Sequence, residues 1–325
     1  MWTAQLAQTA AFMREHDDYL VVSHVQPDGD AVSSTAAVGW MLERLGKSFL
    51  MMNEGPVPSR LHGLWRCEDI AGCGEGAPAR QYRYAIAVDC ADFERLGTVR
   101  SWLAPDCQLL NIDHHATNDG FGAVNLVKPD AAATAEILYE LHQHMNLPLE
   151  PEVATAFYTG LLTDTGGFRY ANTSPRAMEI AADLLRAGVR GAELAELLLE
   201  RMSIGQMRMI QRGLSRLQFS EDSRVSWLWV TSEDLEETGA SNEDLEGLVN
   251  YPRNIEGVEV GILFKENGVK SVKASMRSGG IVNVAEIARS LGGGGHARAA
   301  GVRLTIPLAD AMDLVIARVR QALEA

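Results

Sequence analysis

The sequence contains few cysteines, no long apolar run and fewer basic than acidic residues. Its four cysteines (Cys67, Cys73, Cys90 and Cys107) have neither CxxC spacing nor the density of a secreted disulfide scaffold, so reduced cytosolic thiols are expected. No stretch approaches the roughly 18 consecutive apolar residues that a membrane span needs. The N-terminal segment lacks the basic and apolar regions of a signal peptide and predicts an amphipathic helix instead. We therefore expect a cytoplasmic protein with no membrane partner.

The balance of charge restricts the class of ligand. Lysine and arginine number 29 against 43 aspartates and glutamates, which gives a formal net charge of −14 and a pI near 5.0. Such a chain is poorly suited to sequence-independent binding of long nucleic acid, which depends on counterion release from a basic surface, and no long duplex partner is expected. A short phosphorylated ligand remains compatible, because metal ions and a few Arg and His side chains can attract it locally.

The 325 residues are enough for two domains with separate cores. In the first half, short apolar runs alternate with helical patterns, which predicts an α/β fold with a mostly parallel sheet covered on both faces. A helical linker and a smaller α/β domain are expected to follow, so the predicted division is 1–188, 189–222 and 223–325. The expected strands are 19–23, 49–52, 84–88, 108–112, 225–230, 258–264, 269–276 and 302–306. The expected helices are 31–45, 134–145, 151–162, 282–290 and 308–323, with another starting at Pro175 after the capping region 172–174.

Two of these helices carry further expectations. The helix 31–45 is predicted to be amphipathic. His142 and His144 lie two apart on the helix 134–145, so they do not share a face. Both imidazoles are expected to be solvated.

Aspartate and histidine are concentrated where predicted strands stop. The first such segment contains His24, Asp28 and Asp30 within seven residues, and Pro27 and Gly29 bend the backbone so that the three side chains can converge. Asp30 also suits the N-cap of the following helix, but its two neighbours favour a ligand role. Carboxylate oxygens mixed with imidazole suit Mn²⁺ and related divalent ions better than a structural zinc site. Ligands of parallel sheets bind beyond the carboxyl ends of the strands, which is where this segment lies.

Further carboxylates and a histidine pair extend this candidate site. Asp89 ends a predicted strand, although a turn or capping role would explain a lone aspartate there. Asp113, His114 and His115 follow another strand. Adjacent histidines on an extended segment would face opposite ways, so one is expected to bind metal and the other to meet the substrate, while Asp113 could orient an imidazole. Asp164 is the fourth candidate carboxylate, or else an ordinary residue of a helix C-terminal turn.

A run of four glycines, Gly292–Gly295, precedes His296. It would cost too much chain entropy in an ordered domain to lack a role, and the strand predicted after it argues against a flexible linker. Glycines let backbone N–H groups approach a phosphate or a base closely, and His296 adds a donor. Arg277 ends a predicted strand, and its guanidinium suits fork-like phosphate contact.

The segments HxxxDxD, VDC, DHH, the later aspartate and GGGGH, taken in this order, resemble the DHH phosphoesterase superfamily with its associated C-terminal substrate-binding domain. The resemblance covers essentially the whole chain. It implies that His24 and Asp28 hold one divalent metal ion. It also implies that Asp30, His114 and Asp164 hold a second ion and that Asp89 bridges the two. Mn²⁺ is the expected metal, with Co²⁺ and Mg²⁺ as alternatives.

The same resemblance implies roles beyond metal binding. His115 would contact a substrate phosphate, Asp113 would support it from behind, and a metal-activated water would be the nucleophile. Substrate contacts are further implied for Arg277, Ser278, Gly294, Gly295 and His296.

In size the chain is similar to the bacterial nanoRNase group of this superfamily. That resemblance implies hydrolysis of short oligoribonucleotides and of 3′-phosphoadenosine 5′-phosphate to AMP and phosphate. One alternative is a phosphodiesterase acting on cyclic dinucleotides or on their linear products. Family II pyrophosphatases lack the Gly-rich His loop, and RecJ-type exonucleases usually carry further nucleic-acid-binding domains, so both rank lower. A non-catalytic nucleotide sensor or RNA-binding module is the alternative from another class. The sequence leaves the direction of attack open and is compatible with a homodimer.

Overall fold

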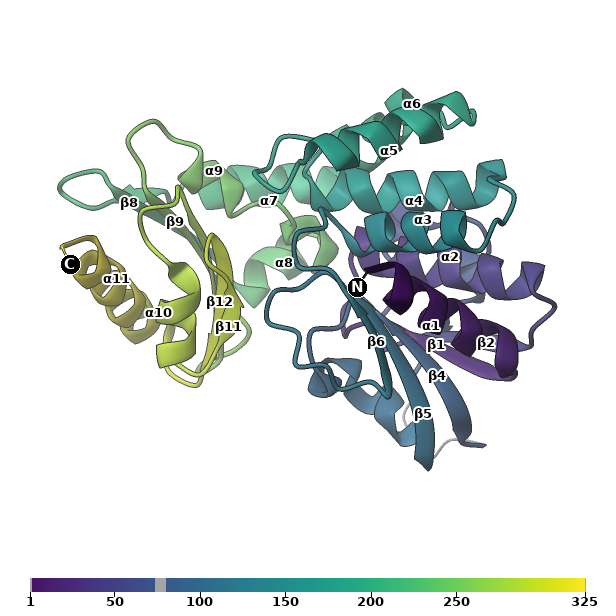
Figure 1. Ribbon diagram of the computed structural model, residues 1–325. Helices are drawn as coiled ribbons and strands as arrows, with labels where there is room; N and C mark the ends of the chain where they lie inside the picture. Colours follow the sequence, from purple (N-terminus) through teal and green to yellow (C-terminus); the bar gives the residue numbers. More distant parts are fainter. Residues whose placement is uncertain (1, 74–79, 325) are drawn as a thin grey trace. The chain divides into compact units, whose positions relative to one another are not determined.

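The computed structural model describes residues 2–73 and 80–324. The chain divides into two compact units, one ending at Arg201 and the other beginning at Met202 (Figure 1). This boundary lies inside the segment 189–222, and the division into two domains and a helical linker stays a prediction. No helix in the described part of the chain is both long and apolar enough to cross a membrane.

The N-terminal unit is built on one six-stranded sheet. All of its strands are parallel, in the order β3-β2-β1-β4-β5-β6, so the predicted parallel α/β architecture is confirmed. In chain order its elements are α1 (Trp2–Glu15), β1 (Tyr19–Val22), α2 (Gly29–Arg44), β2 (Phe49–Asn53), η1 (Ser59–Leu61), η2 (Cys67–Asp69), β3 (Ala71–Gly72), β4 (Tyr82–Val88), η3 (Phe93–Trp102), β5 (Leu103–Asp113), β6 (Val124–Val127), α3 (Thr134–His144), α4 (Pro151–Asp164), α5 (Pro175–Arg186), α6 (Gly191–Ala195) and the π-helical turn η4 (Glu196–Glu200).

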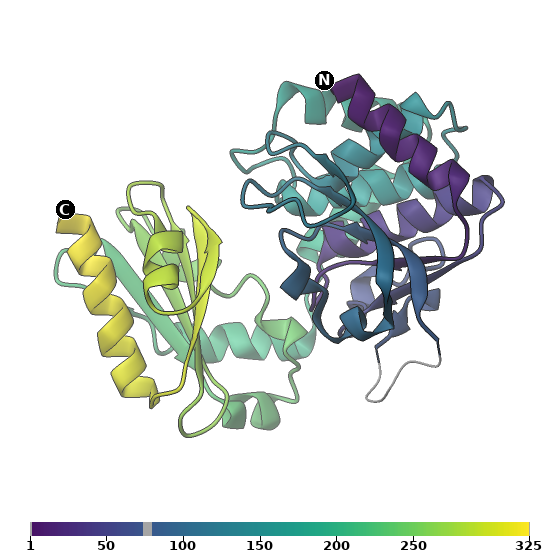
Figure 2. The same ribbon diagram turned by 60° about the horizontal axis from the view of Figure 1, so that its bottom comes forward.

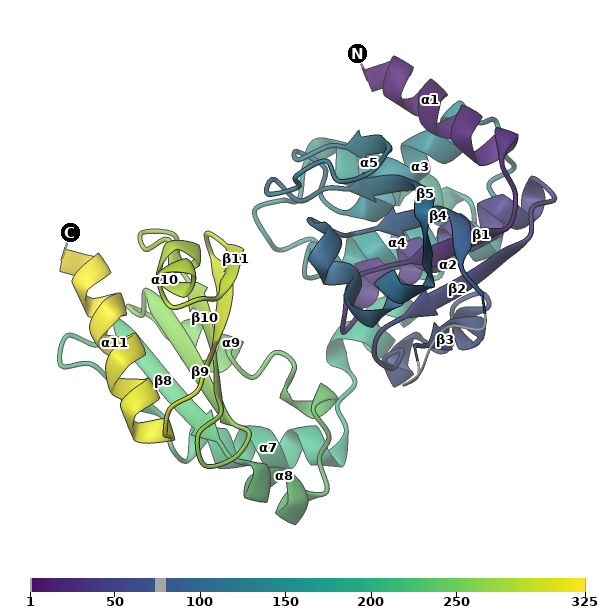
Figure 3. The same ribbon diagram turned by 90° about the horizontal axis from the view of Figure 1, so that it is seen from below.

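Both faces of this sheet are covered, because successive strand residues point to opposite sides. Val21 and Ile86 belong to the large core shared with helices α1 to α4. Leu20 and Ala85 belong to a second cluster on the other face, closed by the 3₁₀ segment η3. Figure 3 shows β1, β4 and β5 side by side between these layers. The connections that leave β1 and β4 therefore run over opposite faces, and such a switch point is where α/β sheets bind ligands.

Helix α2 is enclosed along all but its last turn. Every residue from Gly29 to Leu42 is buried, because the helix lies between the sheet and the helices α3 and α4. The amphipathic pattern expected for this helix is therefore wrong. Helix α4 comes close to α2 at Gly160, where a Cβ atom would lie 2.4 Å from Oδ1 of Asp30. A side chain at position 160 would have to push the two helices apart.

Local sequence patterns predicted some of these elements correctly and failed to predict others. Ser174 caps α5 by accepting a hydrogen bond from the Ala177 N–H, and Pro175 begins the helix, as predicted. Strands β3 and β6 were not expected: β3 has only two residues, and Asn125 interrupts the apolar run of β6. His142 is buried against Trp40 and Phe157, so its expected solvation is wrong.

The C-terminal unit contains a second six-stranded sheet of mixed direction, in the order β11-β12-β10-β9-β8-β7. Only β8 and β9 are parallel neighbours. In Figure 2 the yellow helix α11 lies along this sheet. The elements are α7 (Ile204–Leu214), β7 (Gln218–Phe219), β8 (Val225–Val230), α8 (Ser232–Thr238), η5 (Glu243–Leu245), α9 (Asn250–Arg253), β9 (Val260–Glu266), β10 (Val272–Ser278), α10 (Val284–Ser290), β11 (Gly294–His296), β12 (Ala299–Leu304) and α11 (Leu308–Glu324). The smaller α/β unit expected here is confirmed, and the glycine run forms part of the edge strand β11.

Candidate active site

Three of the predicted ligands lie just beyond the carboxyl ends of three neighbouring strands. Strand β4 pairs with β1 on one side and with β5 on the other. The chain that leaves these strands supplies His24, Asp89 and His114 at the same edge of the sheet. Register therefore brings together residues that are up to ninety positions apart in the sequence.

His24 is held in one tautomer by the backbone carbonyl of the next residue. Its Nδ1 lies 2.9 Å from the Val25 carbonyl oxygen, so Nδ1–H donates and Nε2 keeps its lone pair. That Nε2 lies 3.4 Å from Asp89 Oδ2 and 3.8 Å from Asp28 Oδ2. Such an imidazole is oriented as a metal ligand.

Asp28, and not Asp30, caps α2. Its Oδ1 accepts hydrogen bonds of 3.1 Å from the N–H groups of Asp30 and Ala31, while Oδ2 points to His24. Asp30 lies in the first turn and is buried. Its carboxylate accepts from the N–H groups of Thr134 and Ala135, which begin α3. Oδ1 also accepts from the Ser34 hydroxyl at 3.2 Å, whereas Oδ2 has only the Thr134 donor among the described residues. These bonds fix the side chain and leave Oδ2 with a lone pair for a cation.

Asp89 occupies the centre of the cluster. It adopts a left-handed backbone conformation, with φ of +58°, which is uncommon for a residue other than glycine and is typical of functional positions. Its Oδ2 faces His24, and its Oδ1 lies 3.6 Å from His114 Nε2. The Thr134 hydroxyl donates to the same Oδ1 at 2.9 Å. One carboxylate thus faces both sides of the site.

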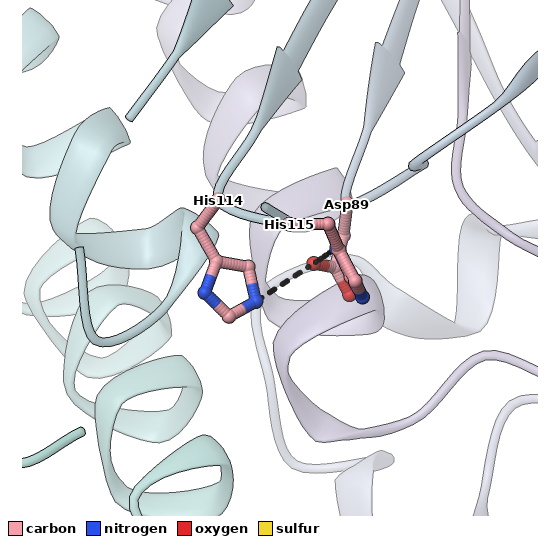
Figure 4. A group of neighbouring side chains, drawn as sticks. All are labelled: Asp89, His114 and His115. Atoms are coloured by element: carbon pink, nitrogen blue, oxygen red, sulfur yellow. Dashed lines mark ion pairs between the residues drawn. The ribbon is translucent and has the colours of Figure 1, made fainter. Parts of the chain in front are cut away.

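The histidine pair lies on the same side of the chain, beside Asp89 (Figure 4). The ring centroids of His114 and His115 are 4.8 Å apart, and His115 Nδ1 lies 3.7 Å from Asp89 Oδ1. The expectation that the two rings face opposite ways is therefore wrong, because both residues follow β5 in a loop where strand alternation no longer applies.

Asp113 supports His115. Its Oδ1 lies 2.7 Å from His115 Nδ1, and its Oδ2 accepts a 2.7 Å hydrogen bond from the Asn118 amide. The His115 ring is therefore held by Nδ1, and Nε2 is directed away from this support. His114 is held differently, through Nδ1 and the Ala131 carbonyl oxygen at 3.2 Å.

Asp164 ends α4 and completes the far side of the cluster. Its Oδ2 lies 3.7 Å from His114 Nε2, and its backbone oxygen accepts a hydrogen bond from the Asn172 amide. The residue is the last of its helix, as one reading of the sequence had it, and also lies among the ligand candidates. The two interpretations are compatible.

The pKa values of four residues in the cluster are raised, which favours their protonated forms at positions where cations could bind. Burial disfavours the charged imidazolium, yet hydrogen bonds to Asp28 and Asp89 raise the pKa of His24 to about 10. Burial also opposes charge on His114, but Asp89 and Asp164 raise its pKa to about 9. Burial raises the pKa of Asp164 to about 7, and burial with the charge of Asp89 raises the pKa of Asp30 well above its usual range. Divalent ions binding here would displace these protons.

The ligand atoms fall into groups of the size that a metal ion needs. His24, Asp28 and Asp89 form one group, and Asp30, His114 and Asp164 form another, with the atoms of each group within 4.8 Å of one another. Asp89 with His114 and His115 forms a third group that overlaps the first two. The donors are carboxylate oxygens and imidazole nitrogens, which suit Mn²⁺ and its neighbours. The residues present therefore fit a divalent metal centre.

The residues predicted to bind substrate lie in the C-terminal unit. Arg277, Gly294, Gly295 and His296 line one open hollow of about 470 Å³. Gly295 has φ of +137°, and a Cβ atom there would lie 2.5 Å from the Ala299 carbonyl oxygen, so only glycine fits. At Gly294 a Cβ atom would meet only open space.

Ser278 lies apart from the open part of this hollow. Its side chain is buried, and its hydroxyl donates to Glu259, which also accepts from the N–H groups of residues 280–282. Ser278 thus helps to fix the turn after β10, and its contact with a substrate stays a prediction.

Sequence reasoning missed Thr134 as a partner of Asp89 and Asp30. Helix-start threonines are common caps, and nothing local in the sequence shows that α3 begins against two candidate ligands 104 and 45 positions earlier. It also missed Lys273 and Arg303, which line the hollow beside Arg277.

Comparison with known proteins places the chain in a family. A model described as "DHH family, N-terminal domain" matches residues 18–161, and one described as "DHHA1 domain" matches residues 225–325. A relative from Thermus thermophilus is 36% identical over 304 residues, which cover 93% of this chain and 89% of the relative. The chain therefore belongs to the DHH superfamily of phosphoesterases that carry a DHHA1 domain.

The Thermus relative is named "bifunctional oligoribonuclease and PAP phosphatase NrnA". Among solved structures, an exopolyphosphatase-related protein from Bacteroides fragilis has a TM-score of 0.89 at 24% identity, over 99% of this chain and 96% of that one. RecJ from Thermus thermophilus, solved with Mn²⁺, has a TM-score of 0.56 at 17% identity, over 99% of this chain and 55% of that one. These two structures show the shared fold.

Proposed function

We propose that this chain is a two-metal phosphoesterase that hydrolyses short oligoribonucleotides and also converts 3′-phosphoadenosine 5′-phosphate to AMP and phosphate. The observation that carries the proposal is the position of Asp89 between two separate ligand groups. The named activity of the Thermus relative supports the choice of substrates, since that relative covers nearly the whole chain. Four free cysteines and short RNA as substrate are consistent with a cytoplasmic location.

In this proposal His24 and Asp28 hold one divalent ion, and Asp30, His114 and Asp164 hold the other. Asp89 contributes to both. Mn²⁺ is the proposed metal, and the Mn²⁺ complex of RecJ supports it. Two such ions, when bound, would lower the pKa of water toward neutrality and stabilise the attacking and leaving oxygens of a phosphoryl displacement.

The remaining residues orient this centre. Backbone carbonyls of Val25 and Ala131 fix the tautomers of His24 and His114. Asp113 accepts from His115 Nδ1, which directs Nε2 of that ring toward a substrate phosphate. The Gly-rich hollow of the C-terminal unit, with Arg277 and His296, is proposed to bind the nucleotide.

The test is an assay of the purified chain with Mn²⁺ on four kinds of substrate. These are RNA of two to five nucleotides, 3′-phosphoadenosine 5′-phosphate, a cyclic dinucleotide and pyrophosphate. Release of mononucleotides from the short RNAs, with AMP from the phosphoadenosine, is the expected result. Cleavage of the cyclic dinucleotide alone would overturn the substrate assignment, and inactivity with two bound metal ions would favour a nucleotide sensor.

A further inference from the structure

One face of the C-terminal sheet is covered over only half of its width. Helices α10 and α11 pack on the first face, against Val272, Ala274 and Met276 of β10. On the second face, α7 packs over β8 and β9, where Leu228 and Leu263 are buried. Within the described part of this unit, no helix covers the second face over β10, β12 and β11, which forms the hollow described above.

This open half carries cationic side chains together with small residues and glycines. Because strand residues alternate between faces, Lys273, Ser275 and Arg277 of β10 point to the open side. Strand β12 places Arg303 and Gly301 opposite Lys273 and Ser275. A sheet face without a large apolar residue is not built to be covered by a helix.

Three cations lie in direct register across this sheet. Lys273 of β10 lies opposite Lys265 of β9 and opposite Arg303 of β12, and we call these residues the cation row. Directly opposed residues have Cβ atoms about 4.5–5.5 Å apart, and like charges at that distance are destabilising. Burial, followed by the charges of Lys273 and Arg303, lowers the pKa of Lys265. The three side chains of the cation row therefore repel one another.

Within residues 2–73 and 80–324, no carboxylate pairs with the cation row. In the same residues its one side-chain partner is neutral, because the Lys265 ammonium donates to the Asn242 amide oxygen. Lys273 and Arg303 are exposed. In a chain with a net charge of −14, three adjacent cations without a counterion indicate a site for an external anion.

The row lies at a defined distance from the Gly-rich end of the hollow. Arg277 pairs with Ala299, which in turn lies opposite His296, whereas Lys273 is four residues earlier on β10. At about 3.4 Å per residue this separates Lys273 from Arg277 by about 14 Å. One phosphate group cannot bridge that distance, so an anion at the row would be a different group from one held at Arg277.

We propose that the cation row binds a second backbone phosphate of an oligoribonucleotide whose first phosphate is held at the Arg277 and His296 end of the hollow. This inference rests on the proposed function and adds to it a basis for discrimination by length. A dinucleotide without terminal phosphates has a single backbone phosphate, so it cannot occupy both positions. Longer oligomers gain the second contact.

The test uses the full-length Mn²⁺-loaded protein and the double variant Lys273→Gln/Arg303→Gln. The matched control is Arg318→Gln/Arg320→Gln, which removes the same charge from exposed positions of α11, on the opposite face. We expect kcat/KM for a pentanucleotide to fall about 10-fold in the row variant, since hydrogen bonds to charged groups have this strength. We expect little change for the dinucleotide and little change for either substrate in the control.

Salt dependence and folding provide separate readouts. For single strands, each lost phosphate contact reduces the slope of log affinity against log salt by about 0.7, so the pentanucleotide slope of the row variant should fall by about that amount. Its thermal midpoint should equal or exceed that of the wild type, because opposed like charges have been removed. Equal losses for both oligomers, or no loss for either, would overturn the proposal.

Failure of this inference is distinguishable from failure of the proposed function. A wild-type protein that cleaves neither oligomer contradicts the proposed function. Binding of a fluorescently labelled pentanucleotide to the same proteins then tests whether the cation row binds phosphate. That proposal is contradicted if the double variant binds as tightly as the wild type, or if the wild type does not bind.

Discussion

The hydroxyl of Thr134 lies 2.9 Å from Oδ1 of Asp89, and the backbone N–H of the same threonine lies 2.7 Å from Oδ2 of Asp30. One residue at the start of α3 therefore holds two carboxylates that the proposal assigns to metal binding. Both bonds are buried, so they are not weakened by competition with water.

Thr134→Val should lower metal affinity while leaving every proposed ligand in place. Loss of an outer hydrogen bond to a ligand typically costs 10–100-fold in metal affinity or activity, and we expect about 10-fold here. Titration with Mn²⁺ followed by activity measures the change. Thr134→Ser keeps the hydroxyl and is the matched control, and equal behaviour of the two variants would show that the hydrogen bond has no such role.

Asp89→Ala should remove both the bound metal and turnover. The residue faces both ligand groups, so we expect kcat to fall by about 10³-fold or more, the scale seen when a preorganised charge-stabilising group is lost. Elemental analysis of the purified protein should show fewer than two metal ions per chain. Asp92→Asn is the control, because this neighbouring carboxylate caps η3 and belongs to neither ligand group. Near-normal activity of Asp89→Ala would contradict the metal assignment.

His296→Ala should raise KM and leave the metal centre intact. The residue lines the hollow of the C-terminal unit, and loss of one hydrogen bond to a charged phosphate predicts an increase in KM of about 10-fold. Metal content and kcat should change little. Loss of bound metal in this variant would mean that the Gly-rich segment has another role.

Gly295→Ala and Gly294→Ala separate the fold of β11 from the function of the hollow. At Gly295 the positive φ and the nearby Ala299 carbonyl predict a loss of about 1–3 kcal/mol in the free energy of unfolding. At Gly294 a methyl group meets open space, so stability should be preserved while KM rises if ligand occupies the hollow. Denaturant unfolding and steady-state kinetics on both variants provide the comparison. Equal stability of the two variants would contradict the role assigned to Gly295.

Protein stability should depend on pH through His142. Burial lowers the pKa of this imidazole, and protonation would place a charge on Nδ1, which has no hydrogen-bond partner among the described residues. The unfolded chain takes up a proton near pH 6.5, while the folded chain does not. Stability from this residue is thus present above pH 6.5 and lost as the pH falls below it. Thermal midpoints at pH 5.5 and 7.5 should differ less in His142→Gln than in the wild type, and His144→Gln should behave like the wild type.

The strand ends that carry the proposed ligands could be predicted from the sequence, because each combines a short apolar run with an abrupt Asp or His. The environment of His142 could not, since its burial depends on packing between α2, α3 and α4 and not on its own helix. The contacts of Thr134 and the alignment of the cation row could not be predicted for the same reason. Their partners are set by helix docking and by strand register, which local patterns do not encode.

Gly160 gives the proposed metal centre a further property. It lies one helical turn before Asp164, on the same face of α4, and its missing side chain lets that helix approach Asp30 on α2. In coordination chemistry the distance between two ligand atoms of one chelate is called its bite. The contact at Gly160 sets the bite between Asp30 and Asp164, the two carboxylates proposed to bind one ion. A methyl group at position 160 would widen the bite, and a wider bite suits Ca²⁺, with oxygen distances of about 2.3–2.6 Å, better than smaller ions such as Mg²⁺. Selection among cations would then be governed by how closely two helices pack.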